Sequence, residues 1–275
     1  MTKPAPLAAS RSRPSRGRAA APLVAIERRG AVTHLRLNRP AKRNALSDAL
    51  VAELQAAFAN LPEAVHAVVL SGEGPHFSAG LDLAELGEHG IAEGMMHSRM
   101  WHAAFERIEF GRVPVIAALR GAVVGGGLEL ASAAHIRIAE RSTFFALPEG
   151  QRGLFVGGGG SARIPRLIGA ARMADMMLTG RVYSAEEGVA IGLAQYVVDD
   201  GQGLTQAFAL AEKVAANAPL SNFAVMHALP RIAGMSRDDG LFTESLMAAI
   251  AQGDDGAKDR MRDFLAGKGA KVRRS

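Results

Sequence analysis

The sequence contains no cysteine and few aromatic residues, and each shortage excludes a class of function. A chain without cysteine forms no disulfide, uses no thiolate nucleophile and binds no zinc through sulfur, and it suits a reducing compartment such as the cytoplasm. Aromatic residues make up only 5% of the chain, too few for the stacking surfaces that bind unpaired bases. A run of about eighteen apolar residues is also absent, so we expect no transmembrane helix.

Sequence motifs for metals and nucleotide cofactors are missing as well. The eight histidines show no metal-ligand spacing, and neither the G-x-G-x-x-G fingerprint nor the nucleophile elbow G-x-S-x-G occurs. The glycine run Gly157–Gly160 is followed by Ser161-Ala162-Arg163 rather than by Gly-Lys-Ser, so it is not a P-loop. We therefore expect chemistry that needs neither a metal ion nor a redox cofactor.

The net charge of +5 belongs to the two ends of the chain. Residues 1–26 carry five basic residues and no acid, and four more basic residues lie in the C-terminal tail, 268–275. Without these nine charges the rest of the chain has a net charge of −4, which argues against nucleic-acid binding. Residues 1–22, rich in Ala, Arg, Ser and Pro, are expected to be disordered, and they fit either an organellar transit peptide or a dispensable extension.

The body of the chain alternates between short apolar runs and amphipathic stretches. Its length suits one large domain, or a domain with a smaller appendage. Strand and helix patterns alternate up to residue 200, which predicts an α/β core over 23–200, and only helical patterns follow over 201–267. The expected strands are 24–28, 32–37, 67–70, 115–119, 136–139, 144–146 and 195–198, and helices are expected after Ser47, from Leu83, over 95–109, around Glu129 and after the capping box Ser184–Glu187.

Two glutamates twenty residues apart are each delivered by a glycine-rich stretch. Glu129 ends the run Gly125-Gly126-Gly127-Leu128-Glu129, and Glu149 precedes Gly157–Gly160. A glycine turn between a strand and a helix exposes unpaired N–H groups and lets a ligand approach the backbone closely. A third loop, Gly74–Leu83, can aim N–H groups from another strand at the same point, as an oxyanion hole requires. The pattern indicates a reaction in which an oxyanion develops while a proton moves.

Four segments in this order resemble the crotonase, or enoyl-CoA hydratase/isomerase, superfamily. Residues 77–83 match its F-x-A-G-x-D-[LI] loop, and residues 121–130 match its G-x-x-x-G-G-G-x-E-L turn. Residues 145–149 with Gly157–Gly160 match F-x-x-P-E followed by G-x-G-G, and residues 39–46 are similar to the R-P-x-x-x-N-A-[LM] loop near the CoA site. The resemblance covers the chain from Val24 to Lys268.

This resemblance implies an architecture and a set of residue roles. The architecture is a superhelix of β-β-α turns, with the C-terminal helices, 201–267, packing on a neighbouring subunit in a homotrimer or hexamer. The backbone N–H groups of Leu81 and Gly126 would form the oxyanion hole. Glu129 and Glu149 would be catalytic, with Glu149 giving a proton to the α-carbon. Contacts with the acyl-CoA substrate are expected from Ala79, Leu81, Asp82, Gly126 and Gly157.

The expected function is the reversible addition of water to a 2-enoyl-CoA, giving a 3-hydroxyacyl-CoA. Family members that hydrate enoyl-CoA carry both glutamates, at the separation found here. Two carboxylates that share a water should raise the pKa of one and leave the other ionised. The alternatives are a double-bond isomerase, a hydroxycinnamoyl-CoA hydratase-lyase, or a non-catalytic protein that binds acyl-CoA.

Three positions depart from the family pattern. His135 stands where many relatives have Asp, which suggests a local hydrogen-bonding role rather than a new catalytic group. Arg152 follows Glu149 by three residues where many hydratases are apolar, and it faces solvent, contacts Glu149 or meets an unusual acyl group. Lys268 is the candidate for a contact with a CoA phosphate.

Overall fold

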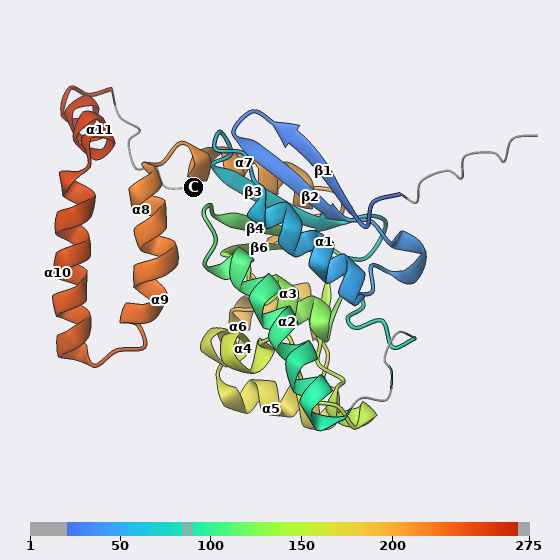
Figure 1. Ribbon diagram of the computed structural model, residues 1–275. Coiled ribbons are helices and arrows are strands. Elements are labelled where there is room, and N and C mark those ends of the chain that lie inside the picture. The colour runs from blue at the N-terminus through green and yellow to red at the C-terminus, as the bar shows by residue number, and fades with distance from the viewer. Residues whose placement is uncertain (1–20, 85–86, 88–89, 269–275) are drawn as a thin grey trace, which may run out of the picture.

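A six-stranded sheet lies at the centre of the computed structural model, which describes residues 21–84, 87 and 90–268 (Figure 1). Its strands follow the order β1-β2-β3-β4-β6-β9. The first pair, β1 and β2, is antiparallel, and every other neighbouring pair is parallel. The strands are β1 (Val24–Arg29), β2 (Val32–Leu37), β3 (Ala67–Gly72), β4 (Val115–Leu119), β6 (Ile136–Glu140) and β9 (Tyr196–Val198).

The inner strands are buried on both faces, as their continuous apolar runs predict. Successive side chains of a strand point to opposite faces, so Val68 of β3 packs into the larger core cluster while Ala67 and Val69 pack into a smaller one. Helix α7 (Gly203–Ala215) contributes small side chains, such as Ala211, to the smaller cluster. One side of the sheet is therefore covered by α7.

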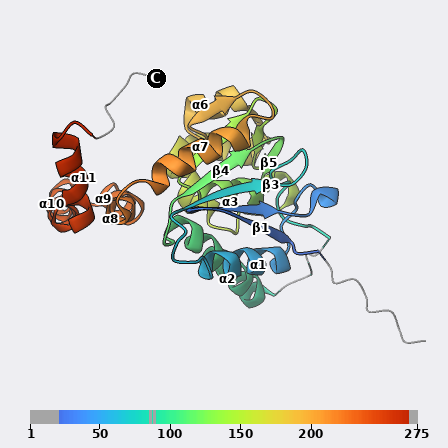
Figure 2. The same ribbon diagram turned by 90° about the horizontal axis from the view of Figure 1, so that it is seen from above.

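Helices α1 (Asp48–Ala59) and α2 (Ile91–Glu109) cover the opposite side of the sheet (Figure 2). Helix α1 begins where predicted, because the Ser47 hydroxyl accepts a hydrogen bond from the Leu50 N–H at 3.2 Å. The buried face of α1 consists of Leu50, Val51, Leu54 and Phe58, a spacing typical of an amphipathic helix.

A second, three-stranded sheet carries the two segments that end in glutamate. Its strands are β5 (Ala122–Val124), β7 (Phe144–Ala146) and β8 (Tyr183–Ser184), in that order. Because β5 and β7 are parallel, the chain leaves both strands at the same edge of the sheet. Short helical elements surround this sheet: α3 (Gly126–Ser132), η2 (Gly150–Arg152), α4 (Gly160–Ile168), α5 (Ala170–Thr179) and α6 (Ala185–Ile191).

The remaining helices lie to one side of the α/β core (Figures 1 and 2). α8 (Pro219–Phe223) continues through a π-helical turn, Ala224–Ala228, into α9 (Leu229–Ile232), and then come α10 (Arg237–Gly253) and α11 (Asp255–Leu265). No helix among the described residues is both long and apolar enough to span a membrane.

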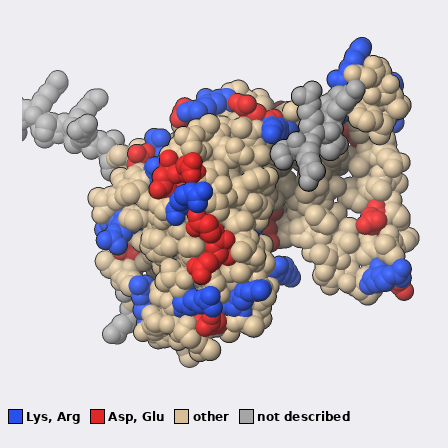
Figure 3. All heavy atoms as spheres, turned by 180° about the vertical axis from the view of Figure 1, so that it is seen from behind, with Lys and Arg blue, Asp and Glu red and all other residues tan. Residues whose placement is uncertain are grey.

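These C-terminal helices expose much apolar surface. Phe242 of α10 is 67% exposed and Leu265 of α11 is 77% exposed. Seen from behind in Figure 3, acidic and basic side chains are interspersed over the core, whereas most of the surface of the C-terminal helices is neither. Further exposed apolar side chains of this region are Phe223, Val225, Leu229, Met235, Leu241, Leu246, Ile250, Met261 and Phe264.

The expected elements are largely confirmed, with differences at short segments. β2, β4 and β7 have the predicted bounds, and α2 begins at Ile91, four residues earlier than expected. β5 was not predicted because its three residues lie inside a glycine-rich stretch, and the two-residue β8 is too short to give a pattern. Leu83 lies in a turn, and the helix expected from it falls partly outside the described residues. Residues 1–20 and 269–275 of the basic tails also lie outside the described residues.

Candidate active site

Two glycine turns bring two free backbone N–H groups together. A Cβ atom at Gly126 would lie 3.5 Å from the Leu81 nitrogen, and one at Gly80 would lie 3.3 Å from the Gly126 nitrogen. Gly80 has a φ of +91°, and a Cβ there would lie 2.6 Å from the carbonyl oxygen of Val124, so only glycine permits this approach. Neither the Leu81 nor the Gly126 N–H donates to another described residue. The pair predicted as an oxyanion hole is thus assembled.

The loop that carries Leu81 is held by the segment before α1. The Leu46 N–H donates to the Gly80 carbonyl at 2.7 Å, and the Asp82 N–H donates to the Leu46 carbonyl at 2.9 Å. The Ser78 hydroxyl adds a bond to the Asn44 carbonyl at 2.8 Å. These contacts fix the backbone on both sides of Leu81.

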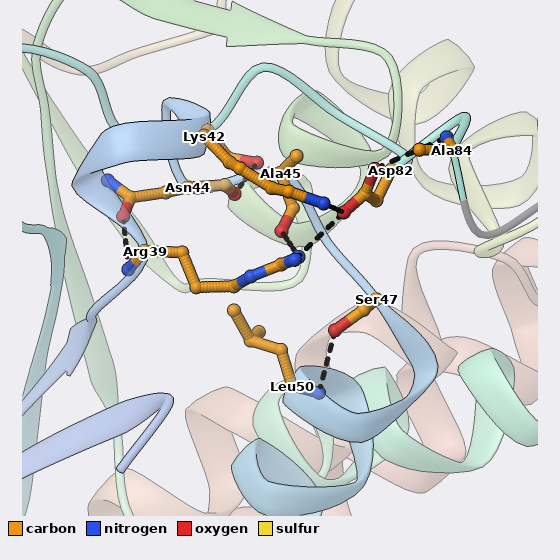
Figure 4. Close-up of polar contacts among 9 residues, drawn as sticks. Arg39, Lys42, Asn44, Ala45, Ser47, Leu50, Asp82 and Ala84 are labelled. Atoms are coloured by element: carbon orange, nitrogen blue, oxygen red, sulfur yellow. Dashed lines mark hydrogen bonds and ion pairs between the residues drawn. The ribbon is translucent and has the colours of Figure 1, made fainter. Parts of the chain in front are cut away.

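Asp82 is buried and paired with two cations, as Figure 4 shows. Its Oδ2 accepts from Arg39 and from Lys42, each at 2.8 Å. The hydrogen bond from Lys42 is the main cause that lowers the pKa of Asp82 to about 2, so the carboxylate is ionised. Asp82 does not line the cavity described below, and its observed role is to anchor the loop next to Leu81.

Glu129 lies in the first turn of α3 and is buried. Its Oε1 accepts from the N–H of Gly158 at 2.7 Å and from the N–H of Gly160 at 2.9 Å. A Cβ at Gly160 would lie 2.7 Å from the Cγ of Glu129, so the carboxylate approaches the glycine run only because side chains are absent there. Burial raises the pKa of Glu129, and these N–H groups act in the opposite direction.

Glu149 follows β7 and has a different environment. A Cβ at Gly125 would lie 2.6 Å from its Oε1, so the side chain reaches the turn at the start of α3. Its Oε2 is buried and has no hydrogen-bond partner among the described residues. Burial, reinforced by the negative charge of Glu129, raises the pKa of Glu149 to about 7. The pKa values of both carboxylates are therefore raised, and that of Glu149 reaches about 7, because burial disfavours the charged form of each.

A cavity of about 210 Å³ joins these groups. Six of the seven different residues that the sequence assigned to the site line this cavity, the exception being Asp82. The side chains of Leu83, Leu154 and Phe155 add apolar wall. The cavity is lined by Ala79, Gly80, Leu81, Leu83, Gly94, His97, Ser98, Trp101, Gly125, Gly126, Glu129, Glu149, Arg152, Leu154, Phe155, Gly157 and Gly158.

One face of α2 also lines the cavity, and no sequence motif indicated this face. The Trp101 ring supports the oxyanion turn, since a Cβ at Gly126 would lie 3.2 Å from it, and its Nε1 donates to Asp48 at 3.0 Å. The Ser98 hydroxyl donates to the Gly157 carbonyl at 2.6 Å. The spacing of Gly94, Ser98 and Trp101, one helical turn apart, is the signal that could have identified this face.

A partly buried ion pair supports the glycine run that holds Glu129. Arg163 of α4 donates to the Glu109 carboxylate at 2.6 Å and to the Gly158 carbonyl at 2.8 Å. No sequence pattern indicates this pair, because 54 residues separate its members. The positive charge of Arg163 also acts to lower the pKa of Glu129.

The three departures from the family pattern have separate outcomes. Nδ1 of His135 accepts from the Val115 N–H at 3.0 Å and its Nε2 donates to the Glu109 carbonyl at 3.1 Å, which confirms a local hydrogen-bonding role. Burial lowers the pKa of His135 to about 4, so the ring is neutral.

Arg152 is exposed and lines the cavity, and its charge acts to lower the pKa of Glu149. Lys268 ends the described chain beyond α11, and its contact with CoA stays a prediction.

Comparison with known proteins identifies the family. Residues 27–265 match the family model described as enoyl-CoA hydratase/isomerase. The chain belongs to the enoyl-CoA hydratase/isomerase family. It is 32% identical over 245 residues to the short-chain-enoyl-CoA hydratase of Clostridium acetobutylicum, covering 88% of this chain and 94% of that protein.

Solved structures of the family share the architecture described above. A protein from Rhodopseudomonas palustris, provisionally named as an enoyl-CoA hydratase, is 57% identical with a TM-score of 0.88, and the match covers 94% of this chain and all of that one. A second, from Thermobifida fusca and also provisionally named as an enoyl-CoA hydratase, was solved in complex with CoA. It is 26% identical, with a TM-score of 0.77, over 83% of this chain and 92% of that one. The chain therefore has the crotonase fold, and a relative with that fold binds CoA.

Proposed function

We propose that the protein adds water reversibly to the double bond of a 2-enoyl-CoA and forms a 3-hydroxyacyl-CoA. The observation that carries this proposal is a single cavity lined by two glutamates and two unpaired backbone N–H groups. Hydration needs a stabilised enolate oxygen, a base for water and an acid for the α-carbon. These four groups can supply all three requirements.

The oxyanion hole acts first on the thioester. Its carbonyl oxygen accepts hydrogen bonds from the N–H groups of Leu81 and Gly126, which draws electron density from the β-carbon. As water adds, negative charge moves onto this oxygen, and donors already in place stabilise it without reorganisation. Ala79 and Gly157 border the same cavity and would contact the substrate near the thioester.

The two glutamates divide the proton transfers. Ionised Glu129 takes a proton from water while the water oxygen bonds to the β-carbon, and Glu149 gives its proton to the α-carbon. The double bond becomes a single bond, and the overall change is the addition of one water. The surroundings favour this division, because N–H groups hold the Glu129 carboxylate whereas Glu149, with a pKa of about 7, keeps a proton near neutral pH.

A spectroscopic assay tests this function directly. Hydration of crotonyl-CoA should remove the absorbance of its conjugated double bond and yield 3-hydroxybutyryl-CoA. A rise in that absorbance from a 3-enoyl-CoA would instead indicate an isomerase, and cleavage of a hydroxycinnamoyl-CoA would indicate a hydratase-lyase. Tight binding of several CoA thioesters with turnover of none would indicate a non-catalytic protein.

We propose further that the protein assembles as a homotrimer, or a hexamer of two trimers. Support comes from the exposed apolar side chains of the C-terminal helices, among them Phe242 and Leu265, since large exposed apolar surfaces generally mark interfaces. α7 packs on the central sheet, so the proposed assembly surface begins after it, with α8. Light scattering at micromolar concentration should give at least three times the mass of one chain, and a stable monomer would contradict the proposal.

A further inference from the structure

Arg152 places an unpaired positive charge on the wall of the cavity. It lines the same space as Glu129 and Glu149. Its guanidinium makes no hydrogen bond or ion pair with any other residue among 21–84, 87 and 90–268. Leu154 and Phe155, which follow it in the chain, line the same cavity.

The backbone fixes where this charge stands. Arg152 ends the short helix η2, and its N–H donates to the Glu149 carbonyl at 2.9 Å. The Leu154 N–H donates to the same carbonyl at 2.9 Å, and Gly153, with a φ of +69°, turns the chain between them. The backbone of Arg152 is therefore held directly after the proposed proton donor, and the residue lines the same cavity.

The other charged groups of the cavity wall have partners. Glu129 accepts from two backbone N–H groups, and His97 is paired with Asp48 at 2.7 Å. Only Glu149 is left to balance Arg152, and in its proton-donating form Glu149 is neutral. In the reactive state no ionised carboxylate among the described residues then pairs with Arg152, so its charge is available to an anionic group of a bound substrate.

We propose that Arg152 binds a carboxylate at the distal end of the acyl group, so that the enzyme prefers short 2-enoyl-CoA substrates with a terminal carboxylate. This inference rests on the proposed function. Leu154 and Phe155 would contact the carbon chain, and a cavity of about 210 Å³ suits a short one. Arginine matches a carboxylate in two parallel hydrogen bonds, which a lysine cannot reproduce.

Kinetics with two matched substrates test the proposal on the full-length protein. The wild type should hydrate glutaconyl-CoA, which carries the carboxylate, with a higher kcat/KM than crotonyl-CoA. Arg152→Leu should lower the ratio of the two values about tenfold or more, and Arg152→Lys should lower it less. The ratio cancels any change in Glu149, since both substrates use the same proton donor. Arg166→Leu, which removes an exposed arginine of α4 outside the cavity, is the control and should leave the ratio unchanged.

Binding measurements separate this inference from the proposed function. Calorimetry with the saturated pair glutaryl-CoA and butyryl-CoA needs no turnover, and the wild type should bind glutaryl-CoA more tightly by a factor that Arg152→Leu abolishes. Equal affinity for both ligands in the wild type overturns the inference, even if crotonyl-CoA is hydrated. Failure to hydrate any enoyl-CoA, with the glutaryl preference intact, overturns only the proposed function. If Arg152→Leu weakens CoA itself as much as glutaryl-CoA, Arg152 binds a phosphate and the inference is wrong.

Discussion

The two regions that deliver the glutamates differ although they begin at the same sheet edge. After β5 the chain turns directly into α3, and Glu129 is enclosed and hydrogen-bonded by the glycine run before α4. After β7 the chain forms only the short helix η2, and Glu149 retains a buried oxygen that has no hydrogen-bond partner in the described part of the chain. The parallel strands β5 and β7 thus place two glutamates at one cavity. The elements that follow each strand differ, and only the Glu129 carboxylate accepts hydrogen bonds from the glycine run.

Because of this difference, the two carboxylates do not bind a proton equally readily. Like charges that share a low-dielectric cavity disfavour double ionisation, so one member tends to retain a proton. Backbone N–H groups stabilise the ionised form of Glu129, whereas the negative charge of Glu129 adds to the burial that raises the pKa of Glu149. In the proposed mechanism the environment, and not the residue type, would assign base and acid.

Replacing either glutamate should have the largest effect. We expect Glu129→Gln and Glu149→Gln each to lower kcat for crotonyl-CoA hydration by about 10²–10⁴, because each removes one proton transfer. The double variant should lose far less than the product of the two factors, since the residues act as a unit. Circular dichroism and binding of CoA should be unchanged. A Glu149→Gln enzyme with near wild-type activity would rule out the two-carboxylate mechanism.

Loss of the ion pair between Arg163 and Glu109 should have the next largest effect. Arg163→Met frees the Gly158 carbonyl and leaves the Glu109 carboxylate unpaired, so the N–H groups that hold Glu129 lose their support. We expect a drop of about tenfold in kcat with little change in KM, which is typical of a lost positioning contact. Arg163→Lys should restore part of the activity. The matched control is Arg166→Met on the exposed face of α4; an equal loss there would contradict a specific role for Arg163.

The sequence predicted the loops of the site far better than their supports. Leu81, Gly126 and the two glutamates were identified because each lies in a short local motif whose glycines have a direct steric purpose. The pair of Arg163 with Glu109 joins residues far apart in the chain, and no local pattern records such a contact. β5 was not predicted because it lies inside a glycine-rich stretch, and the two-residue β8 is too short to give a pattern.

The pH dependence of the wild type should separate the two carboxylates. If Glu149 must carry a proton, kcat/KM for hydration should fall about tenfold per pH unit above the pKa of Glu149, which is about 7. Arg152 acts to lower this pKa, so Arg152→Leu should move the alkaline fall to higher pH. Stopped-flow rates of crotonyl-CoA hydration between pH 5 and 9 would measure both curves. An alkaline fall that Arg152→Leu leaves in place would mean that another group sets it.

The smallest expected effect concerns stability, and it has the opposite sign to the effect on activity. The folded pKa of Glu149 lies above its ordinary value of 4.5, so between pH 4.5 and about 7 the folded protein binds more protons than the unfolded chain. The free energy of unfolding therefore falls as pH rises through that window and levels off above it. Glutamine cannot ionise, so Glu149→Gln should be more stable than the wild type at pH 8 by roughly 1–3 kcal/mol, and nearly equal to it at pH 5.

Urea unfolding at both pH values, at one fixed protein concentration, would measure the difference. Glu129→Gln should gain less, because the two N–H groups that favour its carboxylate offset part of the burial cost. An equal gain for the two variants, or the same gain at both pH values, would show that the two carboxylates do not differ as their surroundings indicate.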